Sequence, residues 1–176
     1  AKALRNEDDY IFAPDMGTDE QCMAWVRDEI GRVVALPREI GGIPLDEIGA
    51  TGWGLLAAAE LAAPMAGVSV EGARVVVQGF GAVGRNAAHF LSERGARLVG
   101  AADSRGAIYN PKGLDVTALR ALKEAGASVA DYPDGESLDR DAVVGLPCDI
   151  WIPAARPDVV NERNVDQLQA RLMVQG

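Results

Sequence analysis

Short apolar runs alternate with amphipathic stretches along most of the chain. The apolar runs have the composition of strands buried on both faces of a parallel sheet, and they cover residues 74–78, 97–101, 148–152 and 171–175. The intervening stretches have helix periodicity or helix-boundary residues, and they cover residues 83–94, 115–124 and a stretch that starts near Asn161. This alternation predicts an α/β fold: a Rossmann-like, doubly wound, mostly parallel sheet with helices on both faces.

The first 50 residues predict one helix and lead into a second. Thr18 is an N-cap candidate with Gln21 three positions on, and Gly31 follows the expected apolar stripe as a stop signal. A further helix is expected over residues 51–63 and ends at Pro64, which cannot continue it. We expect residues 1–176 to form a single domain, into which residues 1–50 lead as a connecting segment.

A glycine-rich turn follows the first long apolar run directly. Gly79 permits a tight turn out of the strand, Gly81 lets the backbone approach a pyrophosphate, and Gly84 lets the next helix pack closely on the sheet. Free N–H groups at the start of that helix favour a phosphate. This strand, turn and helix together predict a dinucleotide cradle, whose expected contacts are Gly79, Phe80, Gly81, Ala82, Val83 and Gly84.

The second apolar run ends at a candidate ribose contact. Asp103 lies about 20 residues beyond the glycine turn, where a carboxylate can accept hydrogen bonds from the 2′-hydroxyl of adenosine. The alternative is that Asp103 and Ser104 merely end a strand and start a turn. Asp103 favours NAD, but Ser104 and Arg105 could donate to a 2′-phosphate, so NADP stays possible.

Charge and cysteine content narrow the class of protein. A net charge of -9 opposes binding to nucleic acids and to anionic membrane surfaces. Cys22 and Cys148 lie far apart in the chain, which argues against a disulfide or metal framework and predicts a reducing, cytoplasmic setting. The longest apolar stretch is interrupted by Glu60 and Pro64, so no membrane span is expected. We also expect no metal site.

Six motifs resemble one family. In order they are Ala13-Pro14-Asp15-Met16-Gly17-Thr18, Met23-Ala24-Trp25, Gly49-Ala50-Thr51-Gly52-Trp53-Gly54, Gln78-Gly79-Phe80-Gly81, Asp103-Ser104-Arg105-Gly106-Ala107-Ile108-Tyr109-Asn110-Pro111 and Cys148-Asp149-Ile150-Trp151-Ile152-Pro153-Ala154-Ala155. On these motifs the whole chain resembles the glutamate/leucine/phenylalanine/valine dehydrogenases, most closely the glutamate dehydrogenase branch. The resemblance implies an NAD(P)-dependent oxidative deamination of an L-amino acid, with glutamate favoured, to a 2-oxo acid.

The resemblance also implies roles for individual residues. Asp15 would shuttle protons in the cleft, although an aspartate just before a capped helix is usually a turn former. Thr51 would contact the nicotinamide carboxamide while capping its own helix. Ala154 and Ala155 would line the nicotinamide-side ribose, and Asp158 stands where many relatives have asparagine.

Some features depart from the family. Ala82 replaces an asparagine in the glycine turn, and Trp53 stands where arginine or tyrosine is usual. The substrate domain with its lysines has no counterpart here, so we expect a fragment of a longer two-domain dehydrogenase, inactive alone, whose sheet is incomplete at one end. The amino acid would be bound through that missing domain, and the full-length protein would be a homo-oligomer, a hexamer in this family. The alternative is a dinucleotide-binding module that does no chemistry.

Overall fold

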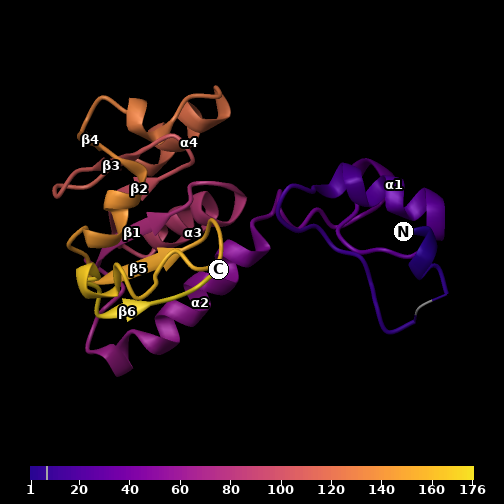
Figure 1. Ribbon diagram of the computed structural model, residues 1–176, viewed down its shortest axis with the longest axis horizontal. Coiled ribbons are helices and arrows are strands. Elements are labelled where there is room, and N and C mark those ends of the chain that lie inside the picture. The colour runs from indigo at the N-terminus through magenta and orange to yellow at the C-terminus, as the bar shows by residue number, and fades with distance from the viewer. Residues whose placement is uncertain (7) are drawn as a thin grey trace. The chain divides into compact units, whose positions relative to one another are not determined.

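The computed structural model describes residues 1–6 and 8–176 and divides the chain into two compact units, Ala1–Ala50 and Thr51–Gly176. The first 50 residues, which the sequence predicts to be a segment leading into the dinucleotide-binding part, make up the first of these units (Figure 1). The first unit contains η1 (Lys2–Leu4), α1 (Glu20–Ile30) and η2 (Arg38–Ile40).

Helix α1 begins one residue later than Thr18 would place it. Asp19 is the N-cap, and its carboxylate accepts a hydrogen bond of 2.9 Å from Cys22 N. The Thr18 hydroxyl is used elsewhere, because it accepts from Asp15 N at 2.8 Å and donates to Asp15 O at 2.9 Å. Gly31 ends the helix with φ of 77°, as predicted.

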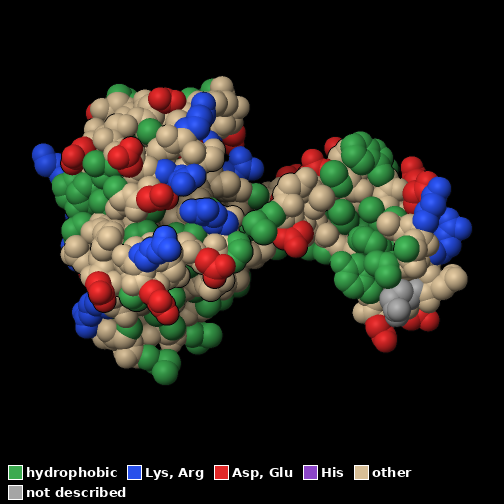
Figure 2. All heavy atoms as spheres, viewed as in Figure 1, with side chains coloured by type: hydrophobic (Ala, Val, Ile, Leu, Met, Phe, Trp, Pro, Cys, Tyr) green, Lys and Arg blue, Asp and Glu red, His purple; other side chains and the backbone are tan. Residues whose placement is uncertain are grey.

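The first unit buries little of its apolar surface. Met23 is the buried residue of α1 within the described part of the chain. In contrast, Met16 is 70% exposed, Trp25 62% and Ile43 67%, and Figure 2 shows apolar side chains gathered on this unit. A single 11-residue helix therefore supplies too little surface to cover these side chains within the unit itself.

The second unit is built on a six-stranded sheet in the order β4-β3-β2-β1-β5-β6 (Figure 1). Parallel pairing joins β1 (Arg74–Gln78) to β2 (Arg97–Ala102) and to β5 (Ile150–Pro153), and joins β5 to β6 (Leu172–Met173). Antiparallel pairing adds β3 (Ala107–Tyr109) and β4 (Glu136–Leu138) at the other edge. The α/β class and the mostly parallel sheet are confirmed.

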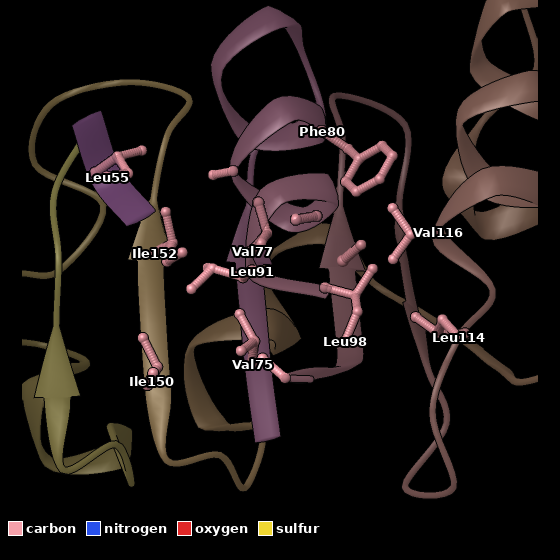
Figure 3. Packing of buried hydrophobic residues seen from close by; sticks show 14 of the residues in the cluster. Leu55, Val75, Val77, Phe80, Leu91, Leu98, Leu114, Val116, Ile150 and Ile152 are labelled. Carbon is pink, nitrogen blue, oxygen red and sulfur yellow. The ribbon is translucent and has the colours of Figure 1, made fainter. Parts of the chain in front are cut away.

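Three α-helices pack on one face of this sheet: α2 (Ala50–Ala62), α3 (Ala82–Glu93) and α4 (Val116–Glu124). Their apolar residues share one core with β1, β2 and β5, as Figure 3 shows for Leu55, Leu91, Val116, Val77 and Ile152. Since a helix needs an apolar stripe against the sheet, this core explains the periodicity of the helical stretches.

The opposite face is covered differently from the expectation. Val143 and Val144 of η5 (Arg140–Gly145) pack there with the fully buried Trp151, whose Nε1 donates to Val143 O at 3.2 Å. The α-helix expected to start near Asn161 is reduced to η6 (Val165–Gln167). The helices on this face are therefore short 3-10 segments. Elsewhere in this unit two further 3-10 helices are η3 (Pro64–Ala66) and η4 (Val129–Asp131), and Val129 of η4 belongs to the core that the α-helices share with the sheet.

The carboxyl ends of the three central strands are tied together. Gly79 N and Phe80 N both donate to Ala102 O, at 2.9 and 2.8 Å, which fixes the glycine turn to the end of β2. On the other side, Ala154 N donates to Gln78 O at 2.7 Å. This edge of the sheet therefore brings together the glycine turn, the end of β2 and Ala154.

Candidate cofactor site

The turn after β1 requires glycine at two positions. Gly79 has φ of 100°, and a Cβ there would lie 2.5 Å from the Cβ of Ala155. A Cβ on Gly84 would lie 1.9 Å from Gly79 O, because the start of α3 packs directly on the turn. Phe80 is buried in the core. The positive φ of Gly79 fits the tight turn predicted for it, and the close contact at Gly84 fits the predicted packing of α3 on the turn.

Gly81 differs from both of these glycines. It is exposed, and a Cβ built on it would have no atom within 4 Å. It is the N-cap of α3 and offers no side-chain cap, so the first N–H groups of the helix, at Ala82, Val83 and Gly84, lack a helical partner. Open space in front of unpaired N–H groups at a helix start suits the pyrophosphate of a dinucleotide.

Two buried polar atoms without a partner flank this turn. Among the described residues, Gln78 Oε1 and Arg85 Nε are the buried side-chain atoms that make no hydrogen bond. Gln78 precedes Gly79, and Arg85 follows Gly84. Unpaired buried polar atoms are uncommon in folded proteins, and they concentrate here at the predicted cradle.

The residues expected at the nicotinamide end lie on two segments. Ala154 is half-buried and Ala155 is exposed directly after β5, where Ala155 touches the Gly79 position. Asp158 is exposed in the same loop and has φ of 59°. Thr51 is exposed in the first turn of α2. Thr51, Ala155 and Asp158 are therefore accessible to a ligand, and Ala154 is partly accessible. Ala155 also lies close to the glycine turn.

Asp103 follows β2 and is buried, with a relative exposure of 9%. Its Oδ1 accepts from Arg105 N at 2.8 Å, Gly106 N at 3.3 Å and the Ser128 hydroxyl at 2.9 Å. The first two bonds close a tight turn, and the third joins that turn to the segment before η4. This carboxylate oxygen is therefore occupied within the protein.

The other oxygen of Asp103 is occupied as well. Its Oδ2 accepts from Lys123 Nζ at 2.6 Å and from Val129 N at 3.0 Å. Burial alone would raise the pKa of Asp103, but the Lys123 ammonium and the hydrogen bonds from Arg105, Val129 and Ser128 lower it to about 2. Asp103 is therefore a charged, internally bonded group.

Lys123, Ser128 and Val129 are the site-adjacent residues that sequence reasoning missed. Lys123 lies in the last turn of α4, where a basic side chain is commonly solvated, yet its side chain is only 21% exposed and pairs with Asp103. No spacing rule links these positions, because the contact depends on how α4 and η4 return to the end of β2.

Asp15 belongs to the first unit. It is exposed, its Oδ1 accepts from Met16 N at 2.7 Å, and its backbone carbonyl accepts from Thr18 N at 2.9 Å. These bonds form the turn that precedes α1. One oxygen of the Asp15 carboxylate therefore stabilises the local turn, and the exposed side chain leaves the other oxygen accessible.

Neither a metal centre nor a membrane helix is found in the described part of the chain. Across residues 1–6 and 8–176, no group of three His, Cys, Asp or Glu side chains could hold a metal ion. No helix in those same residues is long and apolar enough to cross a membrane. Cys22 and Cys148 are both free thiols, and burial raises the pKa of Cys148 to about 12.

Several relatives share both sequence and fold with this chain. The glutamate dehydrogenase of Aeropyrum pernix is 38% identical over 178 residues, which cover 96% of this chain and 42% of the relative. The NADP-specific glutamate dehydrogenase of Saccharolobus shibatae is 36% identical and is matched over 94% of this chain and 41% of its own length. The chain therefore spans about two fifths of these relatives.

Solved structures agree with the sequence matches. The hetero-hexameric glutamate dehydrogenase of Thermus thermophilus, in its Leu-bound form, superposes with a TM-score of 0.82 at 35% identity, covering 94% of this chain and 41% of that chain. Glutamate dehydrogenase of Plasmodium falciparum has a TM-score of 0.80 at 21% identity, which shows the common fold. The family model described as Glutamate/Leucine/Phenylalanine/Valine dehydrogenase matches residues 41–176, and the chain belongs to that family.

Proposed function

We propose that this chain supplies the dinucleotide-binding part of an NAD(P)-dependent amino-acid dehydrogenase. The observation that carries the proposal is the glycine turn: Gly79 and Gly84 are locked by close contacts, while Gly81 stands in open space before the uncapped start of α3. That arrangement accepts a pyrophosphate on backbone N–H groups. The names of the relatives favour glutamate as the amino acid and oxidative deamination to a 2-oxo acid as the reaction.

The dinucleotide would be held along the carboxyl ends of β1, β2 and β5. Backbone N–H groups of Ala82, Val83 and Gly84 would face the pyrophosphate. Thr51 would meet the nicotinamide carboxamide, and the small side chains of Ala154 and Ala155 would line the neighbouring ribose, followed by Asp158. When bound, the cofactor accepts a hydride from the amino-acid Cα. The protein's contribution is to position the cofactor and substrate.

Asp15 would act as the proton acceptor for the amino group. Its exposed carboxylate can take and return a proton as amino acid and imino acid interconvert. We propose that the part of the enzyme that lies outside this chain in the relatives binds the amino acid, and that the complete protein assembles as an oligomer, as the hexameric Thermus relative does. The reducing, cytoplasmic setting expected from the sequence belongs to the same proposal.

Calorimetric titration of the purified 176-residue chain tests the proposal. We expect NADH or NADPH to bind with one site per chain, and we expect no amino-acid-dependent reduction of NAD or NADP by this chain. Positioning and electrostatics supply most of such a rate, so turnover without the substrate domain should be undetectable. Absence of binding to either dinucleotide would contradict the proposal. Turnover by this chain alone would contradict the proposal that a separate substrate domain binds the amino acid.

Asp15→Asn tests the proton role in a protein that also contains the substrate domain. The amide keeps the shape and hydrogen-bonding capacity of the side chain but loses the proton acceptor, so kcat should fall about 100-fold or more while dinucleotide affinity stays within about twofold. Asp19→Asn is the matched control, because Asp19 is a nearby aspartate whose side chain caps α1. A kcat within a few-fold of wild type for Asp15→Asn would leave Asp15 as a turn residue alone.

A further inference from the structure

We propose that one face of α2 is a docking surface for a helix of the same polypeptide, from the part of the dehydrogenase that lies outside these 176 residues. We call it the outer face of α2, and its members are Trp53, Gly54, Ala57, Ala58 and Leu61, continued by Met65 in η3. The inference rests on the proposed function for the existence of a further part of the protein, and no step of it involves the dinucleotide.

Helix α2 is apolar on two opposite sides. Its buried side consists of Gly52, Leu55, Leu56 and Ala59, and Figure 3 shows Leu55 in the core beside Ile152. The outer-face residues recur every three or four positions, as the buried ones do, but lie on the other side of the helix. Glu60 is the one charged residue among the 13 of α2. A helix that is apolar all round is typical of a helix packed on both sides.

The outer face is nevertheless open in this chain. Trp53 is 54% exposed, Leu61 79% and Met65 90%. Gly54 and Ala58, which lie between Trp53 and Leu61 in the helix, are exposed as well. Apolar residues that are exposed together at helical spacing mark a surface that another element covers.

The shape and the charge of the outer face indicate what covers it. Its middle consists of the small residues Gly54, Ala57 and Ala58, so the backbone of a second helix can approach α2 closely there. Beside this face, the Glu60 carboxylate is already paired with Arg94 at 3.0 Å. The face therefore offers close apolar contact rather than charge, and its complement is an apolar side of a helix.

The length of the relatives favours an occupant from the same polypeptide. This chain covers 42% of the Aeropyrum pernix glutamate dehydrogenase and 41% of the Thermus thermophilus chain, so more than half of each relative lies outside the matched part. A segment of the same polypeptide has a high effective concentration, so it can cover the outer face at any protein concentration. A face of this kind left open would instead promote association between molecules.

Leu61→Asp tests the inference by thermal unfolding of two proteins, the 176-residue chain and the complete dehydrogenase. In the complete protein the Tm should fall by about 5 °C or more, because the new carboxylate would be buried without a partner. In the chain alone the side chain is exposed, so the Tm should stay within about 2 °C of wild type. Val165→Asp is the matched control, since Val165 is 47% exposed in η6, and should change the Tm by less than about 2 °C in both proteins.

Ala58→Phe tests the close approach of a helix with an apolar side chain. The chain alone should accept phenylalanine at this exposed position, with a Tm within about 2 °C of wild type. In the complete protein the larger side chain would overpack the contact, so the Tm should fall by about 5 °C or more. Because the substitution adds no charge, a loss confined to the complete protein reports packing against Ala58.

Oxidation of Met65 by hydroxyl radicals tests the inference in the wild type. Met65 should react about tenfold or more slowly in the complete protein than in the 176-residue chain, because its side chain would be covered. The protection should be the same at every protein concentration. This measurement keeps the inference testable if Leu61→Asp prevents the complete protein from folding.

The outcomes separate this inference from the function on which it rests. Equal Tm shifts for Leu61→Asp in the two proteins, or equal reactivity of Met65 in both, would overturn it. Protection of Met65 that grows with the concentration of the 176-residue chain and is lost in Leu61→Asp would show that a second copy covers the face, and would overturn it as well. Neither result bears on dinucleotide binding by the chain, which tests the proposed function separately.

Discussion

The carboxyl ends of β1 and β2 lie side by side in the sheet, yet they use their polar groups in opposite ways. After β1, the Phe80 side chain is buried in the core, Gly81 stands in open space, and the first N–H groups of α3 have no helical partner. After β2, every acceptor direction of Asp103 is taken by the protein itself. We therefore propose that ligand binding at this edge depends on which polar groups are left unpaired rather than on which are charged.

The turns after β1 and β2 are also held in place by different kinds of interaction. The turn after β1 is fixed by contacts of backbone with backbone, such as Gly84 against Gly79 O. The turn after β2 is fixed by a side chain that joins it to α4 and η4 through Lys123 and Val129. Each end should therefore fail in its own way when it is altered.

Gly84→Ala should produce the largest effect. Its new Cβ would lie 1.9 Å from a backbone oxygen, which no rotamer can relieve, so we expect a loss of about 3 kcal/mol in the free energy of unfolding. Gly54→Ala in α2 is the control, because its Cβ would meet no atom within 4 Å and alanine favours helix. Urea unfolding measures both. A loss below about 1 kcal/mol for Gly84→Ala would show that the turn is less tightly packed than the structure indicates.

The pH dependence of stability should show whether Asp103, in the turn after β2, is charged and hydrogen-bonded in the folded protein. The folded-state pKa of Asp103, about 2, lies below its ordinary value of 3.8. Its contribution is therefore present above about pH 4 and is lost as the pH falls toward 2. The stability gap between wild type and Asp103→Asn should narrow by about 2 kcal/mol between pH 5 and pH 2. A gap that stays constant over this range would contradict a charged, bonded Asp103.

Gly81→Ala should give the smallest of these effects and should act on binding alone. Gly81 has φ of -89° and open space around its Cβ direction, so the folded state accepts alanine. The added methyl would occupy space that we assign to the pyrophosphate, and dinucleotide affinity should fall about tenfold, or about 1.4 kcal/mol. Unchanged affinity would place the phosphate elsewhere. A lowered Tm would show instead that the space is not open.

The glycine turn was predictable from sequence because its chemistry is local. Arg74–Gln78, the turn and α3 are contiguous, so periodicity and glycine spacing suffice to place them. The hub at Asp103 was not predictable, since Lys123 and Val129 reach it from other elements and no pattern in the chain links them. The sequence also did not predict β3, because its three residues are too few to show a periodic pattern.

The covering of the second sheet face shows the same limit. An α-helix was expected from about Asn161, but the structure has only η6 there. Asn161 instead bonds within a tight turn, where its Oδ1 accepts from Arg163 N at 3.0 Å and its backbone N donates to Asn164 Oδ1 at 2.8 Å. Asparagine side chains compete in this way with helical hydrogen bonds. A local turn therefore forms where the alternation of strands and helices predicted an α-helix.

Amide resonances of the isotope-labelled chain, followed during titration with NADH, test most directly the claim that the end of β1 binds and the end of β2 anchors. The account predicts that the amides of Ala82, Val83 and Gly84 shift strongly and saturably, because they would donate to the pyrophosphate. The amides of Gly106 and Val129, which donate to Asp103, should shift little. Unperturbed amides at 82–84, or the largest shifts at Gly106 and Val129, would contradict the account.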